Sequence, residues 1–435
     1  MAILPILACE SLLGISKATG GPLPENSQLR QDVSQYRSAG PSPRSLKVPA
    51  VLAKAITENP GNNIKELVQF LTEGETDPFQ AIKNLHDWIA LTISYDFKAF
   101  SSGSIPEQDP WSVLSSRKAV CAGYAALFQR FCELAGFRCT MVSGYSRGYR
   151  YDPFSEEIIA ENHSWNAVKI ADAWYLIDVT WDAGHIFNGR FQREYSTDYF
   201  LLPAEQMIYT HFPTTSTWQM LRIAVSTRQF LSMPHLEGRF FKYSFEGYTG
   251  LLKTYSCDGE LAISLVHDPG IKIQAELRDN KERAVPQAVF IQIIQNGTDV
   301  LIRPQAAGQF ELRVFAANLA SRALEHVWST GVDAVTLTGQ GYPLQFEAYP
   351  AFSCRLVSPL SSPLKVGEIV EFDLVAKTDE ILVVGGSMRR EFSSDSDGRF
   401  VFSIEIPRID RLQVFVREAK GNRYSGILQY RVIAP

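Results

Sequence analysis

The spacing of apolar residues changes along this chain, and that change constrains its fold more than any other feature. Before residue 136 apolar side chains recur at helical intervals, first at Ile64, Leu67, Val68 and Leu71 and then at Ile82, Leu85, Trp88, Ile89 and Ile93. From about residue 138 the spacing shortens toward two, in runs at 140–142, 163–169 and 174–180. The pattern predicts a helical half that leads into a sheet.

A third helix is predicted to begin at or near Cys121. Tyr124, Leu127, Phe128, Phe131, Cys132 and Ala135 follow at helical intervals, and Gly136 comes next as a C-terminal stop. The nucleophilic side chain of Cys121 therefore stands where the helix starts.

The length of 435 residues predicts two to four domains, because a single hydrophobic core stops growing well below this size. Residues 1–47 are expected to form a flexible arm, since the stretch from Gly20 to Pro49 is rich in Gly, Pro, Ser and Gln. Residues 48–229 are expected to form the α+β domain. Beyond about residue 230 short alternating runs predict two β-sandwich modules of the immunoglobulin-like kind, at 230–348 and 349–435.

Composition removes several classes of function. The net charge of −5 and the lack of a Lys/Arg block argue against nucleic acid. No apolar run approaches the roughly 18 residues that cross a bilayer, which argues against an integral membrane segment. The six cysteines are dispersed and lack metal-site spacing, so we predict no disulfide framework and no structural metal. There is also no run of acidic residues suited to calcium, and we predict no metal or other cofactor.

The location of the protein is weakly indicated. Residues 1–20 contain a lipobox-like Ile6-Leu7-Ala8-Cys9 but lack a positive leading region. Asn162-His163-Ser164 is a glycosylation sequon beside a candidate functional histidine, where a glycan would obstruct it. The sequence favours a cytoplasmic setting, with lipid anchoring or secretion through residues 1–20 as the alternatives.

Cys121 is the first candidate for chemistry. A helix N-terminus, with Arg117 and Lys118 close by, lowers the pKa of a thiol and favours the nucleophilic thiolate. Taken alone, a cysteine before a helix is more often a small buried apolar residue. The decision rests on its partners.

His163 and Asp178 are those partners. They lie on two predicted strands, and folding the strands back on each other near residues 170–172 makes the pair opposite or diagonal neighbours. Singly, His163 is more readily a half-buried histidine and Asp178 a strand-end cap. Together, in the order Cys, His, Asp after a helix that starts with the cysteine, they favour a catalytic triad.

The segments RKAVCAGYAALFQRFCELAGF, NHSWNAVKI and WYLIDVTWDAG resemble the three core motifs of the transglutaminase-like superfamily of papain-type cysteine enzymes. SGYSRGYRY, REYSTDYFLLPAEQMIYTHFPTTSTWQML and the β-rich tail are similar to its kyphoscoliosis peptidase branch. The resemblance covers most residues after about Val48.

This resemblance implies a papain-like fold and acyl transfer on a protein or peptide substrate. Cys121 would attack a carboxamide, His163 would move the proton and Asp178 would orient the imidazole. The oxyanion would be held by the Cys121 backbone N–H and a side chain of the preceding loop, Gln108 or Trp111. Hydrolysis and transamidation both fit. The alternative is a non-catalytic scaffold whose β modules bind a protein partner.

The remaining candidates receive no chemical role. His211 lies in IYTHFP, which the resemblance treats as a scaffold feature, and neither it nor His185 is assigned to catalysis. Cys132 and Cys139 are interpreted as packing residues. Trp165, Trp174 and Trp181 flank the triad, and we favour a core position for Trp165 and Trp174.

Overall fold

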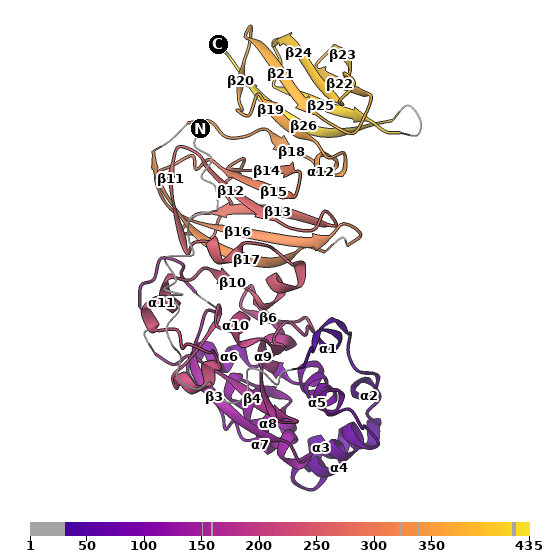
Figure 1. Ribbon diagram of the computed structural model, residues 1–435, viewed down its shortest axis with the longest axis vertical. Coiled ribbons are helices and arrows are strands. Elements are labelled where there is room, and N and C mark those ends of the chain that lie inside the picture. Colours follow the sequence, from indigo (N-terminus) through magenta and orange to yellow (C-terminus); the bar gives the residue numbers. More distant parts are fainter. Residues whose placement is uncertain (1–30, 150, 158–159, 322, 337–338, 420–422) are drawn as a thin grey trace. The chain divides into compact units, whose positions relative to one another are not determined.

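The computed structural model describes residues 31–435, except 150, 158–159, 322, 337–338 and 420–422 (Figure 1). The described residues divide into two compact units, 31–233 and 234–435. Residues 1–30 lie outside the described residues, and with them the lipobox-like segment of residues 1–20 and its Cys9.

The first unit begins with helices, drawn in indigo in Figure 1. The predicted helices at 64–71 and 82–93 are confirmed, and so is the one that begins at Cys121, which ends where Gly136 takes a φ of +84°. Helix α5 is buried along nearly its whole length, which makes it the central helix of this unit. The bounds are α1 Ser34–Ser38, α2 Pro43–Leu46, α3 Ala50–Glu58, α4 Pro60–Thr72, α5 Pro78–Thr92, α6 Phe97–Ser102, α7 Pro110–Ser116 and α8 Cys121–Leu134.

A five-stranded antiparallel sheet packs against α8. Its order is β8-β5-β4-β3-β9, so the strand latest in sequence, β9, joins the edge beside β3 rather than its predecessor β8. The bounds are β3 Arg138–Ser146, β4 His163–Ile170, β5 Ala173–Ile177, β8 Phe200–Leu202 and β9 His211–Pro213. Between β5 and β8 lie α9 Val179–Ala183 and the hairpin β6 Gly184–Phe187 with β7 Arg190–Arg193; α10 Ala204–Met207 follows β8 and α11 Thr227–Ser232 follows β9.

The predicted strand at 174–180 is too long. Strand β5 ends at Ile177, and the backbone turns there because the Asp178 carboxylate accepts hydrogen bonds from the N–H groups of Thr180 and Trp181 at 2.9 and 3.1 Å. Those N–H groups belong to the first turn of α9 and lack helical partners. The helix cap formed by Asp178 therefore ends the strand, although the alternating sequence pattern continues to residue 180.

The expectation of a flexible arm is wrong for residues 33–47. This stretch forms α1 and α2, and Ser42 is buried where its N–H donates to Asp87 at 2.7 Å and its hydroxyl meets the Asn84 side chain at 2.5 Å. Few apolar groups are needed to order the stretch, because α5 supplies partners for its polar ones.

The second unit contains two pairs of β-sheets. The first pair is the sheet β10-β17-β16-β13, with β11 beside β17, and the sheet β12-β15-β14. The bounds are β10 His235–Leu236, β11 Thr254–Asp258, β12 Leu261–Val266, β13 Ile271–Arg278, β14 Val289–Ile294, β15 Gly297–Ile302, β16 Gly308–Asn318 and β17 Glu325–Thr336.

The second pair is the sheet β18-β26-β25-β22-β23, with β20 beside β26, and the sheet β19-β21-β24. The bounds are β18 Leu344–Gln345, β19 Arg355–Ser358, β20 Leu364–Lys365, β21 Ile369–Val375, β22 Glu380–Gly385, β23 Met388–Ser393, β24 Arg399–Glu405, β25 Arg411–Arg417 and β26 Tyr424–Ile433. Alternate residues of β24 are buried, as expected for a sheet with one face toward a core. The predicted α+β fold class with a β-rich tail is confirmed.

The exact domain bounds stay a prediction. The division between the compact units falls between Met233 and Pro234, four residues after the expected end of the α+β domain. The expected boundary between the β modules falls inside the short helix α12, Ala348–Ala351. Among the described residues, no helix has the length and apolarity needed to span a bilayer.

Candidate active site

Cys121 stands at the first position of α8, just after the short strand β2, Lys118–Ala119. Strand β2 pairs in parallel with β1, Ser94–Tyr95, and this pairing fixes the approach to the helix. Gly123 allows the first turn to pack closely, because a Cβ there would lie 2.5 Å from the Gln108 amide oxygen and 2.9 Å from Val113. The half-buried thiol is thus held at a tightly packed helix N-terminus.

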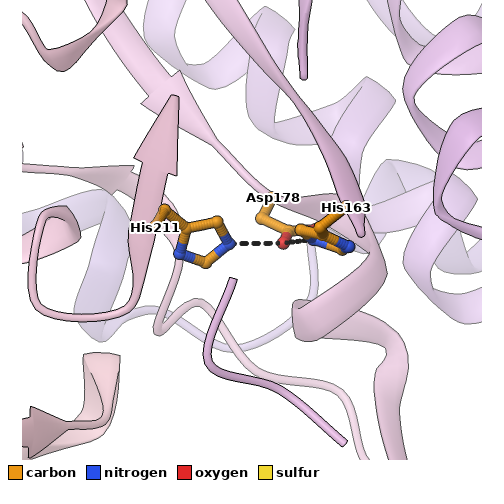
Figure 2. Close-up of side chains that lie close together, drawn as sticks. All are labelled: His163, Asp178 and His211. Carbon is orange, nitrogen blue, oxygen red and sulfur yellow. Dashed lines mark hydrogen bonds and ion pairs between the residues drawn. The ribbon is translucent and has the colours of Figure 1, made fainter. Parts of the chain in front are cut away.

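His163 begins β4, and Asp178 follows the end of β5. The hairpin between them turns at residues 171–172, with Asn166 opposite Ile177. The Asp178 Oδ2 lies 2.5 Å from Nε2 of His163 (Figure 2), while its Oδ1 caps α9. Asp178 is therefore both the strand-end cap and the partner of His163, through different oxygens.

The charges of this cluster are set by burial and by its partners. Burial alone would lower the pKa of His163, but the charge and hydrogen bond of Asp178, together with Cys121, raise it to about 10. Burial would raise the pKa of Asp178, yet His163 and then His211 hold it far below its usual value. The cluster favours an imidazolium beside a carboxylate.

The thiol completes the cluster. Burial would raise the pKa of Cys121, but a hydrogen bond with His163 and the charge of that residue outweigh burial and lower it. The Ser164 backbone lowers the pKa of the Cys121 thiol further. Because Asp178 engages Nε2 of His163, Nδ1 is the ring nitrogen left for the thiol.

His211 also reaches Asp178, although its sequence motif predicted no chemical role for it. Its Nε2 lies 3.0 Å from the same Oδ2 that accepts from His163, and its side chain is fully buried. Figure 2 shows the two imidazoles on either side of the carboxylate. The only sequence signal is a histidine in IYTHFP, 33 residues from Asp178, and nothing local links the two.

The ligand atoms of His163, Asp178 and His211 lie within 4.8 Å of one another, close enough to present three donors to a metal ion. The separations from Oδ2, 2.5 and 3.0 Å, are those of hydrogen bonds from two N–H groups to one carboxylate oxygen. A metal would have to displace both protons. The arrangement therefore suits proton handling.

The two expected oxyanion donors occupy different places. The Gln108 amide oxygen accepts from the Val120 N–H at 2.9 Å and its amide nitrogen donates to the Pro106 carbonyl at 2.9 Å, so Gln108 anchors the residue before Cys121. Trp111 packs beside Gly61, and its ring lies 6.0 Å from the Arg130 guanidinium, more than two helical turns along α8 from Cys121. The role of Gln108 or Trp111 as an oxyanion donor stays a prediction.

Aromatic rings surround the histidines. Trp181 lies 5.5 Å from His163 and 4.5 Å from His211 between ring centroids, and Tyr199 packs on Trp181 at 4.8 Å. Trp165 is buried, as predicted, and its ring stacks 6.0 Å from that of His163. The rings exclude water from the carboxylate, which strengthens its interactions with both imidazoles.

Two family models match the chain. A model described as transglutaminase-like superfamily matches residues 65–179, and one described as a KY-like, immunoglobulin-like domain matches residues 227–334. Cys121, His163 and Asp178 all lie inside the first match, whereas His211 lies outside both. The first unit therefore contains a transglutaminase-like domain, and an immunoglobulin-like domain follows it.

The relatives identify the branch. The chain is 29% identical over 288 residues to human "Kyphoscoliosis peptidase", covering 63% of this chain and 42% of that protein. It is 26% identical over 222 residues to Drosophila melanogaster "Hillarin", covering 47% and 27%, and 28% identical over 195 residues to Caenorhabditis elegans "Lim and transglutaminase domain protein ltd-1", covering 41% and 26%. The matches span less than half of each relative. The resemblance to the kyphoscoliosis peptidase branch is confirmed.

Proposed function

We propose that this protein is a cysteine-dependent acyl-transfer enzyme that acts on carboxamide or peptide bonds of proteins, with Cys121 as nucleophile, His163 as acid and base, and Asp178 as the group that orients the imidazole. The observation that carries the proposal is the 2.5 Å contact between His163 Nε2 and Asp178 Oδ2, beside a Cys121 thiol whose pKa is lowered by His163. A scaffold that had lost its chemistry would not need this contact.

The geometry supports a two-step reaction. The Cys121 thiolate attacks the carbonyl carbon, and the C–N bond breaks as His163 gives its proton to the departing amine or ammonia. The resulting thioester is attacked by water or by a second amine, which passes a proton to His163 as the C–S bond breaks. Water makes the protein a peptidase or amidase, and an amine makes it a transglutaminase.

The helix N-terminus supports stabilisation of the oxyanion. The N–H of Cys121, in the first turn of α8, is one of the donors that a helix leaves without an intrahelical partner. Such a donor can bind the negative oxygen of the tetrahedral intermediate. Of the two expected side chains, Gln108 accepts from the N–H of Val120, the residue before Cys121, and so would act by holding Val120 in place.

The test is to incubate the full chain with a mixed protein substrate in H₂¹⁸O that contains a labelled primary amine, and to map products by mass spectrometry. New ¹⁸O at carboxyl groups reports hydrolysis, and attached amine reports transfer. Cys121→Ala should abolish both. If the native protein gives neither product, the enzymatic proposal is overturned.

The scaffold alternative has its own supporting observation, the immunoglobulin-like domain matched at residues 227–334. Such domains commonly bind proteins, and this one would present a substrate or partner to the transglutaminase-like domain. A chain with Cys121→Ala that still captures a defined partner would favour binding as the function of the tail, independent of catalysis.

A further inference from the structure

The Asp178 carboxylate is held from four directions. Its Oδ1 accepts from the backbone N–H groups of Thr180 and Trp181, and its Oδ2 accepts from Nε2 of His163 at 2.5 Å and of His211 at 3.0 Å. The backbone contacts alone fix the position of the carboxylate. His211 is therefore not needed to place Asp178, and its contact must act on something else.

We propose that His211 is a positioning residue of the acyl transfer proposed above, which shares Asp178 Oδ2 with His163 and so limits how firmly the carboxylate holds the proton of His163. An oxygen that accepts a second strong hydrogen bond has less negative charge to offer the first. His163 must release its proton to the leaving amine, so an unshared carboxylate would retain that proton too firmly.

The surroundings of His211 keep its donor aimed at Asp178. Its Nδ1 lies 2.8 Å from the Thr210 hydroxyl, and that hydroxyl lies 3.3 Å from the Met207 carbonyl. The shorter contact favours a Thr210 hydroxyl that donates to Nδ1, which leaves the proton of a neutral His211 on Nε2. Strand β9 carries His211 opposite Ser146 of β3.

Among the described residues, several titratable and charged groups lie near His211. His163, on β4, lies 5.4 Å away between ring centroids, Asp178 precedes α9, and Tyr199, next to β8, lies 5.5 Å away. Arg147, just after β3, directs its guanidinium at the carbonyls of Tyr209, Phe230 and Met233. The cluster of Cys121, His163, Asp178 and His211 is therefore the electrostatic unit to test.

The test is the pH dependence of Cys121 alkylation by iodoacetamide in the full chain, which requires no substrate. We expect His211→Phe, which keeps a ring but removes the donor, to shift the midpoint of the acid limb down by about half a pH unit or more. Without His211, Asp178 holds the His163 imidazolium more firmly, and the more stable imidazolium makes the Cys121 thiolate harder to protonate. His211→Gln, which keeps an N–H donor, should restore much of the native profile. His185→Phe, a change at an exposed histidine, should leave the profile unchanged.

A shift of the His211→Phe midpoint upward, toward that of a free thiol, would overturn the proposal, since it would mean that His211 only supports the fold of the site. An unchanged midpoint would overturn it as well. If His211→Phe does not fold, Thr210→Val replaces it, with a smaller downward shift expected. A native Cys121 that reacts no faster than Cys139 would instead count against the proposed function itself.

Discussion

Asp182 lies one turn after Asp178 and forms a fully buried ion pair with His86 of α5, 3.1 Å from Oδ2 to Nε2. The other imidazole nitrogen of His86 lies 2.9 Å from Asp87. Burial would lower the pKa of His86, but the hydrogen bonds and charges of Asp182 and Asp87 raise it. The short helix α9, which Asp178 caps, is thereby attached to the central helix of the unit.

Asp182→Ala should destabilise the first unit by about 3 kcal/mol, because it leaves the His86 charge buried with one partner fewer. The same change should raise the apparent pKa of Cys121, since α9 no longer fixes Asp178. Thermal unfolding of the full chain, followed through its first transition, measures the loss of stability. Asp172→Ala is the matched control, since its side chain is 88% exposed and the loss there should be negligible. Equal effects of the two changes would contradict this account.

Asp178→Asn should slow acyl transfer by a factor of about 10² to 10⁴, because the imidazolium loses its carboxylate while the helix keeps a good cap. Cys121 alkylation at pH 6 should slow in parallel, and its midpoint should move toward the ~8.5 of a free thiol. Cys132 and Cys139 serve as internal references in the same peptide map. A variant with native alkylation kinetics would show that Asp178 acts only as a cap.

His163→Gln should reveal the pH range in which the ion pair stabilises the fold. The pKa of His163 rises on folding to about 10, so its contribution is full below the unfolded value of about 6.5 and is lost as pH increases toward 10. The pKa of Asp178 falls on folding, so its contribution is present above about 3.9 and lost in acid. The difference in melting temperature between native and variant chains should be largest from about pH 4 to 6.5. A difference that grows above pH 8 would contradict the assigned charges.

Ser42→Ala should cost about 1 to 2 kcal/mol of stability although it lies in a stretch of low sequence complexity, because the Asn84 side chain loses a buried partner at 2.5 Å. Ser38→Ala, at an exposed position, should change the stability of the chain by less than about 0.5 kcal/mol. Chemical denaturation, monitored by the fluorescence of the first unit, compares the stability of the Ser42→Ala and Ser38→Ala variants. Equal stabilities would restore the interpretation of residues 33–47 as a loose arm.

The helices and strands that carry the proposed triad could be predicted because their signals are local. The helical spacing after Cys121 and the two-residue alternation around His163 each report one buried face, and a turn at residues 171–172 brings the second strand back. The end of β5 was missed, since alternation does not reveal that Asp178 prefers to cap a helix. The three sequence motifs carried the family resemblance for the same reason, as each is continuous in the chain.

Only the tertiary structure decided which distant residues contact the proposed triad. His211 meets Asp178 because β9 joins the sheet beside β3, a choice of strand order that no periodicity encodes. Ser42 is ordered because α5 offers it Asp87 and Asn84. The spacing of apolar residues determines which face of each segment is buried. Buried polar groups, in contrast, gain partners only when distant segments pack together, and that packing sets the hydrogen bonds of this site.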